Sequence, residues 1–61
     1  MLPLERQRRI EALIRTKREA KVTELADLLG VSLATVRRDL MEMERLGMIR
    51  QVHGGAVLAD P

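Results

Sequence analysis

The most restrictive feature of the sequence is a helical pattern that stops at Gly30 and starts again at Ser32. Apolar residues at helical spacing predict a short helix over residues 24–29. Gly30 is a typical residue to follow a helix, and Ser32 is a favoured N-cap for a second helix over residues 33–46, which Gly47 ends. The apolar residues of the short helix are Leu25, Leu28 and Leu29. So short a connection predicts a helix-turn-helix.

One more helix, the first helix of the chain, is predicted before this motif. Pro3 suits the first helical position, because its missing N–H would be unpaired there. An apolar stripe then continues the pattern over residues 3–17. Its buried members are Ile10, Leu13 and Ile14, with Leu4 at the edge. Thr23 is expected to cap the short helix that follows.

After the motif the pattern favours β-structure. Residues 48–52 and 56–58 are β-permissive, and the Gly-Gly pair between them suits a primed hairpin turn. An isolated hairpin is marginal in water, so it should lean on the helices or on a third strand near residues 21–22. The expected fold class is mainly α with a small β-hairpin, a winged helix-turn-helix over residues 1–58. Residues 59–61 read as the start of a linker.

The helix after Ser32 has two different faces when it is plotted at 100° per residue. One face is apolar and is expected to be buried. The opposite face carries two arginines. The apolar set is Leu33, Val36, Leu40 and Met43; the outward set is Ala34, Arg38, Met41 and Arg45; Thr35 and Arg37 lie on the flanks. We expect the helix to pack on a core and to present guanidinium groups outward. Met43 and Met48 should fill core space in a chain without aromatic residues.

Composition excludes several functions. The chain has no Cys, Phe, Tyr or Trp and one His, so disulfides, thiolate chemistry and base stacking on aromatic rings are absent. No cofactor, metal site or catalytic group is therefore expected, and RNA binding is disfavoured. No apolar run exceeds four residues, which excludes a membrane helix, and the charged N-terminus does not resemble a signal peptide. A cytoplasmic protein is expected.

The charge of the chain is unevenly distributed. The total is +2, but residues 1–18 carry +4, residues 19–36 carry −2, and residues 37–61 are neutral. This basic arm, together with the Arg37-Arg38 pair, suggests a polyanionic partner, although solvated helix faces have similar patterns.

Several motifs together are typical of one family. They are Arg6 followed by Ile10 and Ile14, Val31-Ser32, Thr35-Val36-Arg37-Arg38-Asp39-Leu40, Leu46-Gly47, and Arg50 with His53-Gly54-Gly55-Ala56. Over residues 4–58 the chain resembles the N-terminal domain of the DeoR family of bacterial transcriptional regulators. The resemblance implies sequence-specific binding of a duplex operator by a repressor of a sugar operon. It also implies a homo-oligomer whose C-terminal domain, absent here, binds a sugar phosphate.

The residues expected to contact DNA lie on the second motif helix and on the wing. They are Ser32, Ala34, Thr35, Arg37, Arg38, Arg50, His53, Gly54 and Gly55. Arg38 projects furthest outward and suits guanine in the major groove, unless it only pairs with Glu42. Arg37 could reach a phosphate or brace the wing or the first helix. Basic residues of the first helix are expected to hold the DNA backbone.

Other members of the set also have two interpretations. Ser32 should cap its helix in either case, while Thr35 has no capping role and is the better contact to a phosphate. Ala34 permits close approach to a thymine methyl. His53 either donates to a phosphate or packs on the strand, and the Gly54-Gly55 turn either closes the hairpin or approaches a phosphate or the minor groove.

Asp39 would be repelled by DNA, so we expect it to pair with an Arg of the first helix. The alternative function is a winged-helix module for protein interaction or dimerisation, because a fold does not fix a function. An apolar outer face on the second motif helix would favour that alternative.

Overall fold

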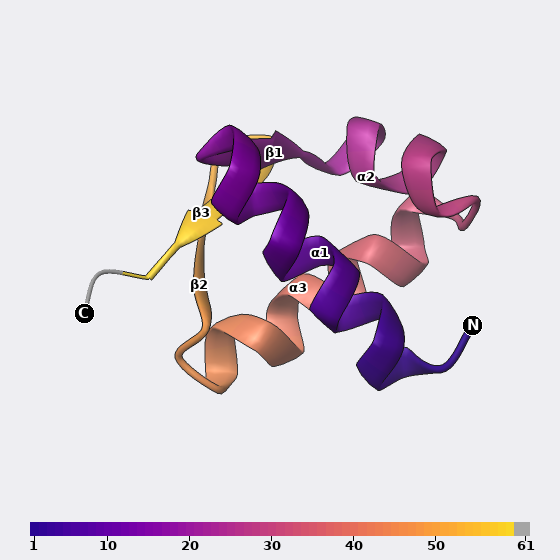
Figure 1. Ribbon diagram of the computed structural model, residues 1–61, viewed down its shortest axis with the longest axis horizontal. Helices are drawn as coiled ribbons and strands as arrows, with labels where there is room; N and C mark the ends of the chain where they lie inside the picture. Colours follow the sequence, from indigo (N-terminus) through magenta and orange to yellow (C-terminus); the bar gives the residue numbers. More distant parts are fainter. Residues whose placement is uncertain (60–61) are drawn as a thin grey trace.

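Three helices and a three-stranded sheet make up the part of the chain that the structure describes, residues 1–59 of a computed structural model. In Figure 1 α1 crosses α3, β1 leads directly into α2, and β2 and β3 lie at the end away from α2. The elements are α1 (Pro3–Lys17), β1 (Glu19–Lys21), α2 (Val22–Leu29), α3 (Leu33–Arg45), β2 (Ile49–Val52) and β3 (Gly55–Leu58). The prediction of a winged helix-turn-helix is confirmed.

The turn between α2 and α3 has the predicted chemistry. Gly30 adopts a left-handed conformation, with a φ of 67°, and its N–H donates to the carbonyl of Ala26. The N–H of Val31 donates to the same carbonyl at 3.1 Å. The Oγ of Ser32 then accepts from the N–H of Thr35 at 3.1 Å and caps α3. The sharp end of one helix and the capped start of the next therefore fix the angle between them.

The prediction that Thr23 caps α2 is wrong. The helix begins at Val22, with Lys21 in the N-cap position and no side-chain cap. The N–H of Val22 donates at 2.9 Å to the carbonyl of Gly54, which lies in the wing. Because a wing carbonyl accepts this bond, the helix can start two residues earlier than its sequence pattern indicates.

The far end of α3 also differs by one residue from the prediction. The last helical residue is Arg45, and Leu46 is the C-cap. Gly47 follows with a φ of 78°, a conformation that an L side chain rarely adopts. The chain then reverses, and the N–H of Met48 donates to the carbonyl of Met43 at 2.9 Å. This reversal sends β2 back beside α3.

The sheet is antiparallel and has the order β1-β3-β2. The third strand is present, but at residues 19–21, slightly before the predicted place. Ala20 pairs with Ala56, and Lys21 pairs with Gly55. A Cβ on Gly55 would collide with the carbonyl oxygen of Ala20. Gly55 is therefore required because β1 passes so close to it.

The wing turn is not of the primed type that the Gly-Gly pair suggested. Val52 pairs with Gly55, so the loop contains only His53 and Gly54. Of these two, only Gly54 has a positive φ, 75°. A positive φ at the second loop position alone is the pattern of a type II turn. Gly54 thus provides the positive φ of the turn, and Gly55 provides the space that β1 needs beside β3.

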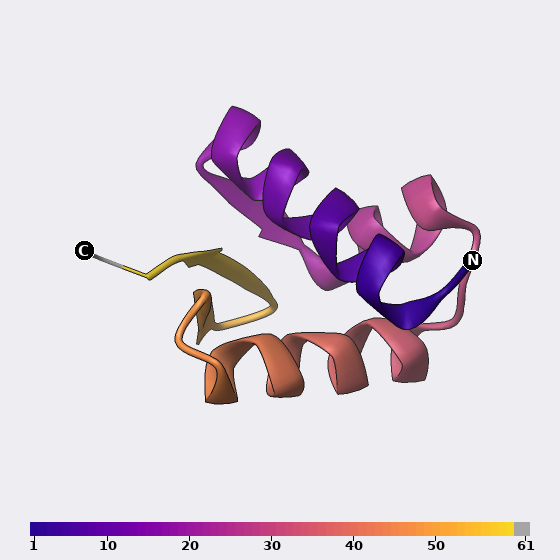
Figure 2. The ribbon, with the colours of Figure 1, turned by 60° about the horizontal axis from the view of Figure 1, so that its bottom comes forward.

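The core lies between α1 and α3, with the sheet at one end (Figure 2). Its fully buried large side chains are Ile10, Ile14, Leu25, Val36, Leu40, Met43 and Ile49. Met48 is half-buried against this cluster. Leu28 and Leu33, which were expected inside, are 57% and 39% exposed. Leu33 occupies the first position of α3, at the margin of the core, and Leu28 belongs to a helix too short to be covered on all of its apolar side.

One charged pair lies at the edge of this core. Asp39 of α3 is buried, and its carboxylate accepts two hydrogen bonds from the guanidinium of Arg6 in α1. The carboxylate raises the pKa of Arg6 through these hydrogen bonds, against the opposing effect of burial. The prediction that Asp39 pairs with an arginine of the first helix is confirmed.

Candidate nucleic-acid interface

Helix α3 presents a polar face away from the core. Figure 2 shows α1 and α3 in separate layers, with the inner side of α3 turned toward α1 and the sheet. Val36, Leu40 and Met43 on that inner side are fully buried. The exposed residues of the other side are Ala34, Arg37, Arg38, Met41, Glu44 and Arg45. The packing therefore leaves the arginine-bearing side of the helix open along its length.

The start of α3 carries two linked hydroxyl groups. Ser32 Oγ accepts from the N–H of Thr35 and donates to Thr35 Oγ1 at 3.0 Å. The backbone N–H of Thr35 is the group that Ser32 caps, while the side chain of Thr35 caps no backbone group, as expected. The hydroxyl proton of Ser32 is used within this pair, whereas that of Thr35 is left to donate elsewhere. Of the two, Thr35 is thus the better donor to an external acceptor.

Arg38 is exposed and makes no ion pair within residues 1–59. The alternative that it pairs with Glu42 is wrong, because that carboxylate binds Arg45, with N–O distances of 2.6 and 3.0 Å. This pairing holds the pKa of Glu42 below its usual value and raises that of Arg45. The guanidinium of Arg38 keeps its full donor capacity.

A groove of about 480 Å³ separates α3 from the wing and from the start of α2. Arg37 lies in the wall of this groove and forms no ion pair within residues 1–59. It therefore does not brace the wing or α1 through a carboxylate of these residues. The other lining residues are Val22, Thr23, Met41, Gln51, Val52, Gly54 and Gly55. The groove thus combines one cation with a hydroxyl, an amide and the glycine backbone of the wing.

The wing residues fall into three different environments. His53 and Gly54 form the exposed tip, so the alternative that His53 packs on the strand is not supported. Gly55 lines the groove but is otherwise buried against β1. Arg50 alternates with the buried Ile49 and is exposed, which places it on the outer face of the sheet. Arg50 is not among the groove residues.

Contact between β2 and α3 holds the wing in place. The carboxylate of Glu44 accepts from the backbone N–H of Gln51 at 2.9 Å and from its side-chain Nε2 at 3.4 Å. On its other side the wing bonds to Val22 through Gly54. The tip is therefore attached to both helices of the motif.

The basic arm at the N-terminus is largely neutralised. Arg9, Arg15 and Lys17 have carboxylate neighbours, and Arg6 is used by Asp39. Helix α1 also covers the inner side of α3, away from the outward arginines (Figure 2). Arg8 and Arg18 have no ion pair within residues 1–59, and the expectation that basic residues of the first helix hold the DNA backbone stays a prediction.

Sequence reasoning missed part of the groove. Thr23 and Gln51 line it, yet they come from α2 and β2, and no local pattern links them to α3. Met41 could have been found from the sequence, because it is an apolar residue on a face of α3 that is otherwise mostly polar. It is 65% exposed.

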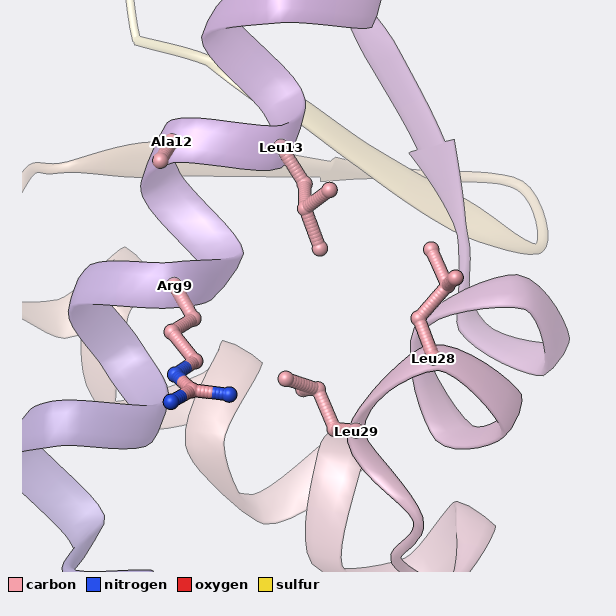
Figure 3. A pocket seen from close by; sticks show the side chains of 5 residues that line it. All are labelled: Arg9, Ala12, Leu13, Leu28 and Leu29. Carbon is pink, nitrogen blue, oxygen red and sulfur yellow. The ribbon is translucent and has the colours of Figure 1, made fainter.

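A second hollow, of about 340 Å³, lies between α1 and α2 and is mostly apolar (Figure 3). Leu13, Leu28 and Leu29 point toward one another there, with the side chain of Arg9 at one end. Residues 1–59 hold no group of three His, Cys, Asp or Glu side chains placed to bind a metal ion. Among the same residues, every helix falls short of the length and apolar character that crossing a membrane requires.

Comparison with known proteins identifies the family. The DeoR-like helix-turn-helix domain matches residues 6–61. The chain belongs to the DeoR-like helix-turn-helix family. Its relatives are named as transcriptional regulators and repressors, and the DeoR-like domain is the DNA-binding helix-turn-helix of such proteins.

Three relatives resemble this domain over 85–95% of its length. The transcriptional regulator GolR of Listeria innocua is 48% identical over 95% of this chain and 23% of its own. GlpR of Haloferax volcanii is 53% identical over 93% of this chain and 22% of its own. The lactose phosphotransferase system repressor of Streptococcus mutans is 48% identical over 85% of this chain and 21% of its own. The DeoR-like domain thus spans under a quarter of the length of these relatives.

A solved structure shares the fold. It is described as an ICLR transcriptional regulator from Silicibacter sp., with a TM-score of 0.85 and 23% sequence identity. The match covers 98% of this chain and 24% of that one.

Proposed function

We propose that this domain binds duplex DNA in a sequence-specific manner, with α3 in the major groove and the wing on the backbone or in the minor groove. The observation that carries the proposal is the exposed Arg38, which has no ion pair within residues 1–59, on the outward side of a helix whose inner side is fixed in a core. An α-helix with its side chains is about 10–12 Å across, and the major groove is about 12 Å wide. The helix therefore fits the groove if its outward side is free, as it is here.

Arg38 is the residue we propose to read a base. Its guanidinium has no carboxylate partner within residues 1–59, so no internal ion pair has to break before it binds. The planar fork of an arginine matches O6 and N7 of guanine, a contact that discriminates by about 1–3 kcal/mol. Ala34, one turn earlier, leaves room for the helix to approach a thymine methyl.

The groove beside α3 suits the sugar–phosphate backbone. Arg37 supplies a charge in its wall, and Thr35 has a hydroxyl proton left to donate at the start of α3. His53 and Gly54 stand exposed at the wing tip, where a side chain and an open backbone can meet a phosphate or the minor groove. Arg50, on the outer face of the sheet, would extend these contacts along the backbone. Ser32 and Gly55 mainly hold this surface in shape.

The regulatory context comes from the relatives. Some are named as repressors, one of them of a lactose phosphotransferase system. By analogy, we place this domain in a homo-oligomeric repressor of a sugar operon, relieved by a sugar phosphate bound to another domain. Two linked copies would bind an operator more tightly than one through avidity. No catalytic step is part of this function.

One observation favours the alternative, a module for protein interaction or dimerisation. The hollow between α1 and α2 is apolar, and Leu28 at its rim is 57% exposed. Because this hollow lies away from the outward side of α3, a protein partner there would not compete with DNA. The outward side itself carries arginines, which does not suit an apolar partner.

Selection of bound duplexes from a random pool, followed by fluorescence anisotropy at two salt concentrations, tests the proposal. Arg37→Ala should flatten the slope of log K against log salt by about one unit, because one phosphate contact is lost. Arg38→Ala should instead relax the preference at one base pair. Arg8→Ala is the matched control, since Arg8 is an exposed arginine of α1 without an ion pair within residues 1–59. Equal losses in all three variants would refute the assignment of roles.

A further inference from the structure

We infer that Met41 is a specificity-determining residue that contacts the 5-methyl group of a thymine beside the guanine bound by Arg38. This inference rests on the proposed function. It starts from the exposure of Met41, whose side chain is 65% accessible in the third turn of α3. The core already contains Met43, fully buried two positions later, so Met41 is not needed for packing.

The position of Met41 on the helix places it among the proposed DNA contacts. At 100° per residue it lies between Arg37, which lines the groove, and Arg38, which points outward. It also lines the groove between α3 and the wing. A helix that sits in the major groove with Arg38 toward the bases therefore brings Met41 to the same groove floor.

Helical rise gives the span of this contact. Ala34 and Met41 are seven residues apart, about 10 Å along the axis, and Arg38 lies between them. Base pairs are about 3.4 Å apart along the duplex axis, and a helix in the major groove is inclined to that axis, so the three residues span at most about three base-pair steps. The thymine is thus expected within a few base pairs of the guanine.

The chemistry of the side chain selects the ligand. The major groove offers one apolar feature, the thymine methyl, and an apolar side chain can bind it. Methionine is unbranched and polarisable, and it adapts to an irregular surface better than leucine or valine. A protein partner is a poorer occupant, because Arg37 and Arg38 on both sides of Met41 would have to be desolvated with it.

The test removes a single methyl from DNA. In the duplex obtained by selection, each dT near the guanine that depends on Arg38 is replaced in turn by dU, which lacks the 5-methyl group. Affinity is measured by anisotropy for the parent, Met41→Ala and Met41→Leu. Leu4→Ala serves as the control, since Leu4 is similarly exposed, at 60%, on α1. Far-UV circular dichroism checks that each variant is folded.

One dT should stand out. Its replacement by dU should weaken the parent, Met41→Leu and Leu4→Ala about fourfold, the value of one buried methyl-sized group, and Met41→Ala by less than about twofold. Equal sensitivity of Met41→Ala and the parent at every dT would overturn the inference. So would a parent that is insensitive to every replacement, or a selected site without dT near the guanine. In these cases sequence-specific binding itself would stand; a pool that yields no preferred duplex would instead refute the proposed function.

Discussion

Replacement of Arg6 by methionine should cost the domain a large part of its stability. The side chain of Arg6 is 13% exposed and that of Asp39 is 5% exposed, so the substitution leaves the buried carboxylate of Asp39 without its partner. Removing one partner of a buried ion pair costs about 3–5 kcal/mol, and the partial exposure of Arg6 points to the lower end, about 3 kcal/mol. A 61-residue chain is stable by about 3–9 kcal/mol, so the variant would be marginal.

The reverse substitution should be milder. In Asp39→Leu the charge that remains is on Arg6, whose long side chain can turn its head into water, so a loss of about 1 kcal/mol is expected. The double variant, Arg6→Met with Asp39→Leu, removes both charges and replaces them with apolar groups. It should recover most of the loss of Arg6→Met, because an apolar pair of similar volume is often as stable as a buried ion pair.

Urea unfolding followed by far-UV circular dichroism measures these differences, since the chain has no Trp or Tyr for fluorescence. Arg9→Met is the matched control, because Arg9 is an exposed arginine of the same helix with a distant carboxylate neighbour at 3.8 Å. Its loss should stay below about 0.5 kcal/mol. The reasoning fails if Arg6→Met is no worse than Arg9→Met, or if the double variant loses the sum of the two single effects.

Three further predictions concern the turns and one exposed ion pair. Gly54→Ala should cost about 1–2 kcal/mol of unfolding free energy in urea for its positive φ alone, whereas Gly55→Ala should cost more, because its Cβ would meet the backbone of β1. Ser32→Ala should lower the free energy of unfolding by about 1 kcal/mol in the same assay, because the helix cap is lost. Ser32→Asp should keep most of the parent stability, because aspartate also caps a helix. In a carboxyl NMR titration Glu24 should show a pKa below its ordinary value, because Lys17 Nζ donates to it at 2.6 Å. The stabilisation from this pair is present at neutral pH and lost as the pH falls through the folded-state pKa; an unchanged pKa in Lys17→Met would contradict this.

The local chemistry of the sequence was enough to predict the helix-turn-helix. Gly30 and Ser32 act on their own neighbours, so their roles as helix end and helix cap could be read without the rest of the fold. Asp39 could also be placed, because a carboxylate at the border of an apolar face needs a basic partner, and α1 supplied one.

The features that sequence did not reveal depend on contacts between distant segments. Thr23 does not cap α2, because Gly54 accepts the bond from Val22 across 32 positions of the chain. Gly55 resembles a turn residue in the sequence, but its conformation is ordinary, and β1 is the reason that no side chain fits. Leu28 matched the apolar period of its helix and is nevertheless exposed. Periodicity indicates an apolar side and does not show how much of it a neighbour covers.

The candidate site was predicted in the same uneven way. Arg38 could be placed outward from helical geometry alone, and it is exposed. Arg50 could not be placed, because its direction depends on the register between β2 and β3, which a short strand does not specify. The surroundings of the basic residues of α1 could not be predicted either, because the carboxylates that pair with Arg6 and Lys17 come from α3 and α2.

The two hydrogen bonds from Gln51 to Glu44 have a consequence for any duplex that the domain meets. They join β2 to α3, so in the proposed docking the helix in the major groove and the loop beside it move together. A DNA segment of unsuitable groove width then has to bend or twist to reach both. The energy of that deformation varies with base composition, so operators should be selected partly at positions that no side chain touches.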